Sequence, residues 1–92
     1  MKFEWDEDKS EINRRKHQVR FDEAQTVFLD PLAIDLYDED HSEGEDRFIR
    51  IGVSGKLKVL LVVYCLRDES HIRIISARKA TAEERKVYEK GI

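Results

Sequence analysis

Apolar and polar residues alternate over several short stretches of this chain, a pattern typical of strands that bury one face. The stretches predict five strands, at Lys2–Trp5, Leu32–Tyr37, Arg47–Val53, Leu57–Leu66 and His71–Arg78. Segments of only three or four residues separate the last three strands. Connections this short demand antiparallel neighbours, so the second half of the chain predicts an antiparallel meander.

Three other segments have helical signals. Asp6 is a residue type that caps helix N-termini, and a charged helix is expected to follow it. A second, short helix is expected to end before Pro31, because proline disfavours helix in the residue that precedes it. Its apolar residues recur on one helical face, at Phe21, Ala24, Val27 and Phe28. A third helix is expected from Thr81 to about Lys90, where Thr81 and Glu84 have the spacing of a capping box.

The elements follow the order β-α-α-β-β-β-β-α. This order predicts an α+β fold in which helices pack on a small antiparallel sheet. The chain has 92 residues, which suits one domain spanning residues 1–92 with a core just large enough to fold unaided.

Side-chain parity restricts where two arginines of the last strand can act. Successive side chains of a strand point to opposite faces, so Arg73 and Arg78 are expected on opposite faces unless a bulge intervenes. Arg78 and Arg47 both lie at strand ends. The parity therefore favours a site at the rim of the sheet over one at its middle.

The charge is unevenly distributed along the chain. Residues 1–46 carry 6 Lys and Arg against 15 Asp and Glu, whereas residues 47–92 carry 11 against 5. The net charge of −3 therefore conceals a basic half that can face a polyanion. The alternative is that the two halves interleave in space and their charges cancel.

Composition narrows the cellular setting. One cysteine, Cys65, allows no disulfide framework, and its place in an apolar run favours a buried side chain over a nucleophile. The N-terminus lacks the apolar region of a signal peptide. The longest apolar run, Val59–Leu66, is too short to span a bilayer. We expect a cytoplasmic protein that makes no membrane contact.

Several common sites are excluded by spacing. An EF-hand beginning at Asp38 would place Glu43 where glycine is needed and Ile49 where the bidentate glutamate is needed. The motifs of hydrolase triads, zinc proteases and nucleotide-phosphate loops do not occur. We therefore expect neither a metal site nor a cofactor, and interpret residues 38–46 as a solvated acidic loop.

The three histidines lie in different settings. His17 ends the first predicted helix, where a protonated imidazole is favoured; its alternative role is to cap the last helical carbonyls. His41 lies in the acidic loop and is expected to be mobile. His71 begins a strand, and we interpret it as exposed and incidental.

The remaining polar residues form a cationic set that suits RNA cleavage without a metal. Its members are Lys16, His17, Glu45, Arg47, Arg67, Arg73 and Arg78. The 2′-hydroxyl must lose a proton, the pentacoordinate phosphate must be stabilised, and the leaving 5′-oxygen must gain a proton. Arginine stays protonated at neutral pH, so His17, Glu45 or Lys16 must transfer the protons. The alternative is that these residues form a solvated sheet face closed by a surface helix.

These residues belong to a longer series of motifs in which the chain resembles the BrnT family, the toxins of BrnT/BrnA type II toxin–antitoxin modules. The series is Phe3-x-Trp5-Asp6, Lys9, Asn13, Lys16-His17, Phe21-x-x-Ala24-x-x-x-Phe28-x-Asp30-Pro31, Glu45-x-Arg47, Ile51-Gly52, Arg73-Ile74-Ile75-Ser76-Ala77-Arg78 and Glu84-Arg85-x-x-Tyr88. Each motif is short, but their order and spacing extend over nearly the whole chain.

The resemblance implies a RelE-like fold and a metal-independent ribonuclease that arrests growth by damaging translation. It implies a BrnA-like antitoxin with a ribbon-helix-helix domain, through which the complex would bind and repress its own promoter. The implied catalytic residues are His17, Glu45, Arg47, Arg73 and Arg78, and the implied RNA contacts are Lys16, Arg67 and Tyr88. The acidic net charge is unusual for such a toxin, so an inactive homologue that serves as a co-repressor is the alternative.

Overall fold

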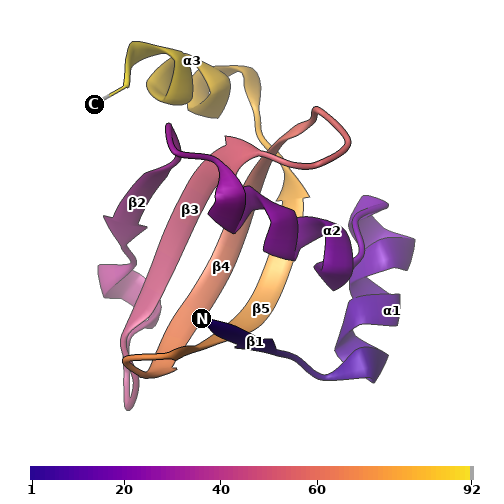
Figure 1. Cartoon of the computed structure of the whole chain (residues 1–92), viewed down its shortest axis with the longest axis vertical. Coiled ribbons are helices and arrows are strands. Elements are labelled where there is room, and N and C mark those ends of the chain that lie inside the picture. Colours follow the sequence, from indigo (N-terminus) through magenta and orange to yellow (C-terminus); the bar gives the residue numbers. More distant parts are fainter. Residues whose placement is uncertain (92) are drawn as a thin grey trace.

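The computed structural model describes residues 1–91, which form three α-helices, two 3₁₀ turns and a five-stranded sheet (Figure 1). In chain order the elements are β1 (Lys2–Glu4), α1 (Glu7–His17), α2 (Phe21–Gln25), η1 (Thr26–Leu29), β2 (Ile34–Tyr37), η2 (Glu39–His41), β3 (Arg47–Val53), β4 (Val59–Asp68), β5 (His71–Lys79) and α3 (Ala82–Lys90). Within residues 1–91, no helix is long and apolar enough to cross a membrane.

The strands are ordered β1-β5-β4-β3-β2 across the sheet. Strands β2 to β5 form the predicted antiparallel meander. Strand β1 pairs with β5 in parallel, so the sheet is mixed and the prediction of a wholly antiparallel sheet is wrong. Short turns dictate direction only for the strands they join, and β1 and β5 are far apart in the chain. The RelE-like fold was predicted together with an antiparallel sheet, and because the sheet is mixed, the RelE-like relationship stays a prediction.

Local signals explain where the helices begin. The Asp6 carboxylate accepts hydrogen bonds from the backbone N–H groups of Asp8 and Lys9, at 2.9 and 3.2 Å. At α3 the predicted capping box is present: Thr81 Oγ1 accepts from the Glu84 N–H at 3.2 Å, and the Glu84 carboxylate accepts from the Thr81 N–H at 2.8 Å. The second helix is shorter than predicted, because its last turn is the 3₁₀ turn η1.

One face of the sheet packs against α1 and α2 and forms the core (Figure 1). Val19 comes from the loop between α1 and α2, Phe21 and Ala24 from α2, and Val27 from η1; the strands contribute Leu60, Val62, Tyr64, Ile72, Ile74 and Ala77. The Cys65 thiol is fully buried, as the sequence predicted. Arg67, predicted to lie in a turn, is instead part of β4, which continues to Asp68.

A bulge in β5 changes the parity of its arginines. Val63 pairs with Ser76 and Tyr64 with Ile74, so Ile75 is an extra residue in the strand. Ile72, Ile74 and Ala77 all remain buried in the core. Arg73 and Arg78 therefore lie on the same face of the sheet, opposite α1 and α2. Strict alternation of side chains would place them on opposite faces, and the bulge accounts for the difference. We call the face opposite α1 and α2 the outer face of the sheet.

The Asn13 side chain joins α1 to β5. Its Nδ2 donates to the carbonyl oxygens of Val19 and Ala77, both at 2.8 Å, and its Oδ1 accepts from the Ala77 N–H at 3.2 Å. Strand β1 pairs with β5 only at residues 71–73 within the described chain. The Asn13 amide thus takes the place of a neighbouring strand beside Ala77 and satisfies a backbone N–H and C=O that are buried.

A second polar contact anchors α3. The Asp30 carboxylate accepts from the Val53 N–H at 2.9 Å and from the Tyr88 hydroxyl at 2.6 Å. The bond to Asp30, with partial burial, raises the pKa of Tyr88 to about 12. Gly52 lies beside this contact, and a Cβ there would lie 2.9 Å from both Ala33 Cβ and Val27 Cγ1. The close packing of β3 under the Asp30 loop therefore requires glycine.

We expect Asn13→Ala to lower the free energy of unfolding by about 2–4 kcal/mol, because it leaves buried backbone groups unpaired. Urea denaturation measures the loss. Lys9→Ala, an exposed change on the same helix, serves as the control and is expected to stay within about 0.5 kcal/mol of the wild type. An equal effect of the two substitutions would contradict the role given to the Asn13 amide.

We expect Gly52→Ala to lower the free energy of unfolding by about 1–3 kcal/mol through overpacking. Gly55 is the matched control, because a Cβ there would meet Thr26 atoms at 3.5 Å or more, which is ordinary contact. Thermal denaturation of both variants tests the expectation. Similar melting temperatures for the two would show that β3 can shift away from the Asp30 loop.

Candidate functional site

A shallow pocket of about 550 Å³ opens on the outer face of the sheet. We call it the rim pocket. Its floor consists of apolar side chains from three adjacent strands, Ile49, Leu61, Val63 and Ile75. Its polar lining consists of His17, Asp38, Asp40, His41, Arg47, Ser76, Arg78 and Glu84. Three of the predicted catalytic residues, His17, Arg47 and Arg78, therefore share one pocket.

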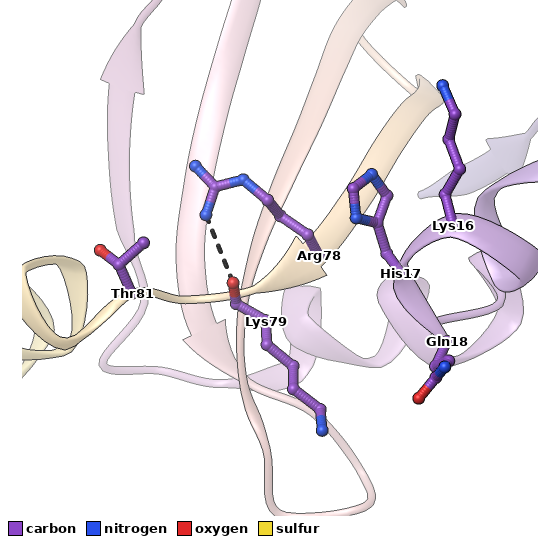
Figure 2. A pocket seen from close by; sticks show the side chains of 6 residues that line it. All are labelled: Lys16, His17, Gln18, Arg78, Lys79 and Thr81. Atoms are coloured by element: carbon purple, nitrogen blue, oxygen red, sulfur yellow. Dashed lines mark hydrogen bonds between the residues drawn. The ribbon is translucent and has the colours of Figure 1, made fainter.

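A second hollow of about 500 Å³ adjoins the rim pocket, since His17 and Arg78 line both. Its other residues are Lys16, Gln18, Lys79 and Thr81. Figure 2 shows Lys16, His17 and Arg78 extending toward one side of this hollow, whereas Gln18 and Lys79 extend toward the other. The end of α1 and the end of β5 thus form a basic wall beside the rim pocket.

The end of α1 places His17 at this wall. Gln18 adopts a left-handed conformation (φ 60°), and its N–H donates to the Arg14 carbonyl oxygen at 2.8 Å. Gln18 therefore caps the helix, the role that was the alternative for His17. No hydrogen bond within residues 1–91 joins the His17 ring to the carbonyl groups of the helix, so the imidazole is available to a ligand.

Arg78 is held by α3. Its Nη1 and Nη2 donate to the two carboxylate oxygens of Glu84 at 2.7 and 2.9 Å, and Nη1 also donates to the Lys79 carbonyl oxygen at 3.3 Å. These hydrogen bonds raise the pKa of Arg78, and they lower the pKa of Glu84 despite its partial burial. Among the described residues, Arg78 Nε has no hydrogen-bond partner, and Nη2 has a second N–H, beside Nε, in addition to the one that Glu84 accepts. This free Nε–Nη2 edge is a side-on pair of donors, which suits two phosphate oxygens.

Arg47 contributes a second guanidinium group to the rim pocket. It is the first residue of β3, and its N–H donates to Ser42 Oγ at 3.0 Å while its carbonyl oxygen accepts from the Asp38 N–H at 2.9 Å. Its Nε is buried and has no hydrogen-bond partner within residues 1–91. Buried polar groups are nearly always paired, so this Nε is an exception. As a permanently charged group in the pocket lining, the Arg47 guanidinium is suited to an anionic ligand.

The remaining predicted residues lie outside the rim pocket. Arg73 Nη1 lies 3.6 Å from Glu4, and Arg67 lies 3.8 Å from Glu4 and 3.7 Å from Glu45. Arg67, Arg73, Glu45 and Glu4 thus form a second ionic cluster on the outer face. Tyr88 is bound to Asp30 and lines another hollow next to Pro31. The structure brings Lys16, His17, Arg47 and Arg78 together, but not Glu45, Arg67, Arg73 or Tyr88.

His41 is a pocket residue that the sequence analysis missed. It lies in η2, and its Nδ1 is 3.1–3.2 Å from the Asp38 carboxylate. The acidic loop is folded back onto the start of β3 by the Ser42 and Asp38 hydrogen bonds with Arg47. The spacing of Asp38 and His41, three residues apart, was the available signal, since it allows a carboxylate–imidazole pair within one helical turn.

Within residues 1–91, no three His, Cys, Asp or Glu side chains gather closely enough to hold a metal ion. The polar lining of the rim pocket combines two imidazoles and two guanidinium groups with three carboxylates and the Ser76 hydroxyl. Fold and pocket together define a small α+β protein whose pocket gathers guanidinium and imidazole groups, a combination suited to a phosphodiester.

The family model described as "Ribonuclease toxin, BrnT, of type II toxin-antitoxin system" matches residues 5–84. The chain belongs to this family, which confirms the resemblance seen in its motifs, and membership implies an antitoxin partner. The fold is similar to that of the Brucella abortus ribonuclease toxin BrnT, known from a crystal structure at 1.1 Å resolution. The TM-score is 0.69 at 24% identity, over 88% of this chain and 97% of that one. No curated protein matches the chain.

We expect Glu84→Gln to destabilise the protein by about 0.5–1 kcal/mol at pH 7, a modest effect because the ion pair is partly exposed. The pKa of Glu84 is lowered in the folded state, so its contribution is complete above the usual pKa of 4.5 and is lost as the pH falls below it. The difference in unfolding free energy between variant and wild type should therefore shrink between pH 7 and pH 3. Glu83→Gln, on the exposed side of the same turn, is the control; a pH-independent difference for Glu84→Gln would refute the explanation.

Proposed function

We propose that this chain is a metal-independent endoribonuclease that inhibits translation and growth, and that the rim pocket is its active site. The observation that carries the proposal is that His17, Arg47 and Arg78 line one pocket although they come from α1, β3 and β5. A BrnA-like ribbon-helix-helix antitoxin would neutralise it in the cytoplasm. The complex would repress its own promoter, so that DNA is contacted only through the antitoxin.

The proposed reaction is transesterification within the RNA strand. The 2′-oxygen attacks the adjacent phosphorus, and the bond from phosphorus to the 5′-oxygen breaks, which leaves a 2′,3′-cyclic phosphate and a 5′-hydroxyl. The free edge of Arg78 and the guanidinium group of Arg47 would bind the phosphate oxygens. Fixed cations at such a developing charge can contribute about 10²–10³-fold in rate. His17 would transfer one of the protons, and Lys16 would attract the RNA backbone to the basic wall.

The second ionic cluster would bind RNA outside the scissile phosphate. Arg47, Cys65 and Arg73 are direct cross-strand neighbours, so Arg73 lies two strands, or roughly 10 Å, from Arg47. Arg73 and Arg67 already contact Glu4, and Arg67 also contacts Glu45, through loose ion pairs that a phosphate can displace. We therefore propose that Arg67 and Arg73 bind the RNA backbone and that Glu45 holds Arg67 in place. For Arg73 and Glu45, we prefer these roles to the direct catalytic role that the sequence suggested.

A non-catalytic co-repressor is the second candidate function. The observation in its favour is that Glu84 neutralises much of the charge of Arg78, in a protein whose net charge is −3. This candidate predicts promoter binding with the antitoxin but no RNA cleavage by the chain alone.

We expect Arg47→Ala and Arg78→Ala each to reduce RNA cleavage by at least about 100-fold, because each removes a charge at the scissile phosphate. Induction of the wild type in bacteria should stop growth, and induction of either variant should not. The purified proteins should be assayed on a defined RNA in EDTA, with detection of the 2′,3′-cyclic phosphate. Arg15→Ala removes an exposed arginine of α1 outside the pocket and should keep activity within about threefold.

The variants must also be tested for antitoxin binding, so that lost toxicity is not mistaken for lost folding. Full antitoxin binding without cleavage by the wild type would support the co-repressor. Cleavage only with added divalent metal would overturn the proposed chemistry while retaining a nuclease.

A further inference from the structure

We propose that His41, oriented by Asp38, is the second proton-transfer residue of the rim pocket and acts on an RNA phosphodiester from the side opposite His17. The inference rests on the proposed ribonuclease function and deepens it. Its basis is the position of His41 in the pocket and its contact with a largely buried carboxylate.

The two imidazoles enter the pocket from opposite sides. His17 comes from α1, which packs beside β5, whereas His41 comes from η2, which directly precedes β3. Strand β4 lies between β5 and β3 and contributes Val63 to the apolar floor. A phosphodiester seated on this floor would therefore have one imidazole on either side.

Asp38 determines which nitrogen of His41 is available. The carboxylate lies 3.1 Å from Nδ1 and its side chain is only 13% exposed, whereas the His41 side chain is 67% exposed. A carboxylate at Nδ1 keeps the proton on that nitrogen, so Nε2 remains to accept or donate a proton. The loop is anchored, since Ser42 Oγ donates to the Asp38 carbonyl oxygen and accepts from the Arg47 N–H.

The reaction needs two proton-transfer groups. As the bond between the 2′-oxygen and phosphorus forms, a base takes the proton from the 2′-hydroxyl; as the bond to the 5′-oxygen breaks, an acid protonates that oxygen. No net proton is consumed. Of the three pocket carboxylates, Asp38 is bound to His41 and Glu84 to Arg78, while Asp40 is exposed on η2. His17 and His41 are therefore the groups best placed to divide the two transfers.

The carboxylate contact alone does not make a histidine catalytic, and the chain contains a natural control. His71 Nδ1 lies 2.9 Å from the Asp68 carboxylate, also three residues earlier in the chain. That pair closes the turn between β4 and β5, and neither residue lines the rim pocket. The location of His41, and not its ion pair, distinguishes it.

The test measures kcat, KM and the pH profile of the full-length chain on an RNA oligonucleotide with one cleavage site. We expect His41→Gln to lower kcat by at least about 100-fold with KM within about threefold, whereas His71→Gln stays within about threefold of the wild type in both. The wild-type profile should be bell-shaped, and His41→Gln should remove one limb and His17→Gln the other. Asp38→Asn, a positioning change, should lower kcat by roughly tenfold and keep both limbs.

Other groups can also titrate in this pocket, so the shape of the profile decides the matter. The titratable and charged groups that share the pocket with His41 are Asp38, Asp40, Arg47, His17, Arg78 and Glu84. If His41 has only a structural role, His41→Gln would lower kcat by the same factor at every pH and keep both limbs of the pH profile. That result would overturn the inference. So would a kcat within threefold of the wild type. RNA cleavage by wild type and His41→Gln alike would refute this inference alone, whereas no cleavage by the wild type would refute the proposed function and this inference with it.

Discussion

The hydrogen bonds of the Asn13 amide are the constraint on which the rest of the structure depends. Within the described chain, β1 pairs with β5 only as far as residue 73, so beyond that residue the edge of β5 that faces away from β4 has no neighbouring strand. Ala77 nevertheless lies buried at this edge. One side-chain amide satisfies both backbone groups of Ala77 and also the Val19 carbonyl oxygen. The same bonds place the end of α1 next to Arg78, so the interaction that closes the core also assembles the basic wall of the pocket.

The bulge at Ile75 is the second feature on which the pocket depends, because it changes which side chains of β5 face the core and which face outward. In a regular strand, Arg78 on the outer face would require Ile72 and Ile74 to leave the core and Arg73 to enter it. One extra residue lets Ile72, Ile74 and Ala77 face the core while Arg73 and Arg78 both face outward. Bulges re-aim side chains in this way near functional sites. Here the bulge also brings Ile75 into the pocket floor.

Features with a local cause could be predicted from the sequence, and features that depend on distant parts of the chain could not. The cap at Asp6, the capping box at Thr81 and the antiparallel turns of the meander follow from neighbouring residues. The parallel pairing of β1 with β5 and the extra residue at Ile75 depend on tertiary packing, which no short segment reveals. His17, Arg47 and Arg78 were predicted from residue type and strand position. His41 was missed because its acidic neighbours suggested a solvated loop, whereas backbone hydrogen bonds to Arg47 fold that loop against the sheet.

The rim pocket lies between a basic wall and the acidic residues of η2, and this bears on how an acidic protein could act on RNA as we propose. Lys16, His17, Arg78 and Lys79 gather at the end of α1 and β5, whereas Asp38 and Asp40 lie on the side of η2. Affinity for a nucleic acid grows with the number of phosphates neutralised, and few cations here lack a carboxylate partner, since Glu84 holds Arg78 and Glu4 lies near Arg73. For the proposed reaction, the arrangement favours a short footprint of a few phosphates around the scissile bond. Specificity for the point of cleavage would then rest on the geometry of the pocket more than on the strength of RNA binding.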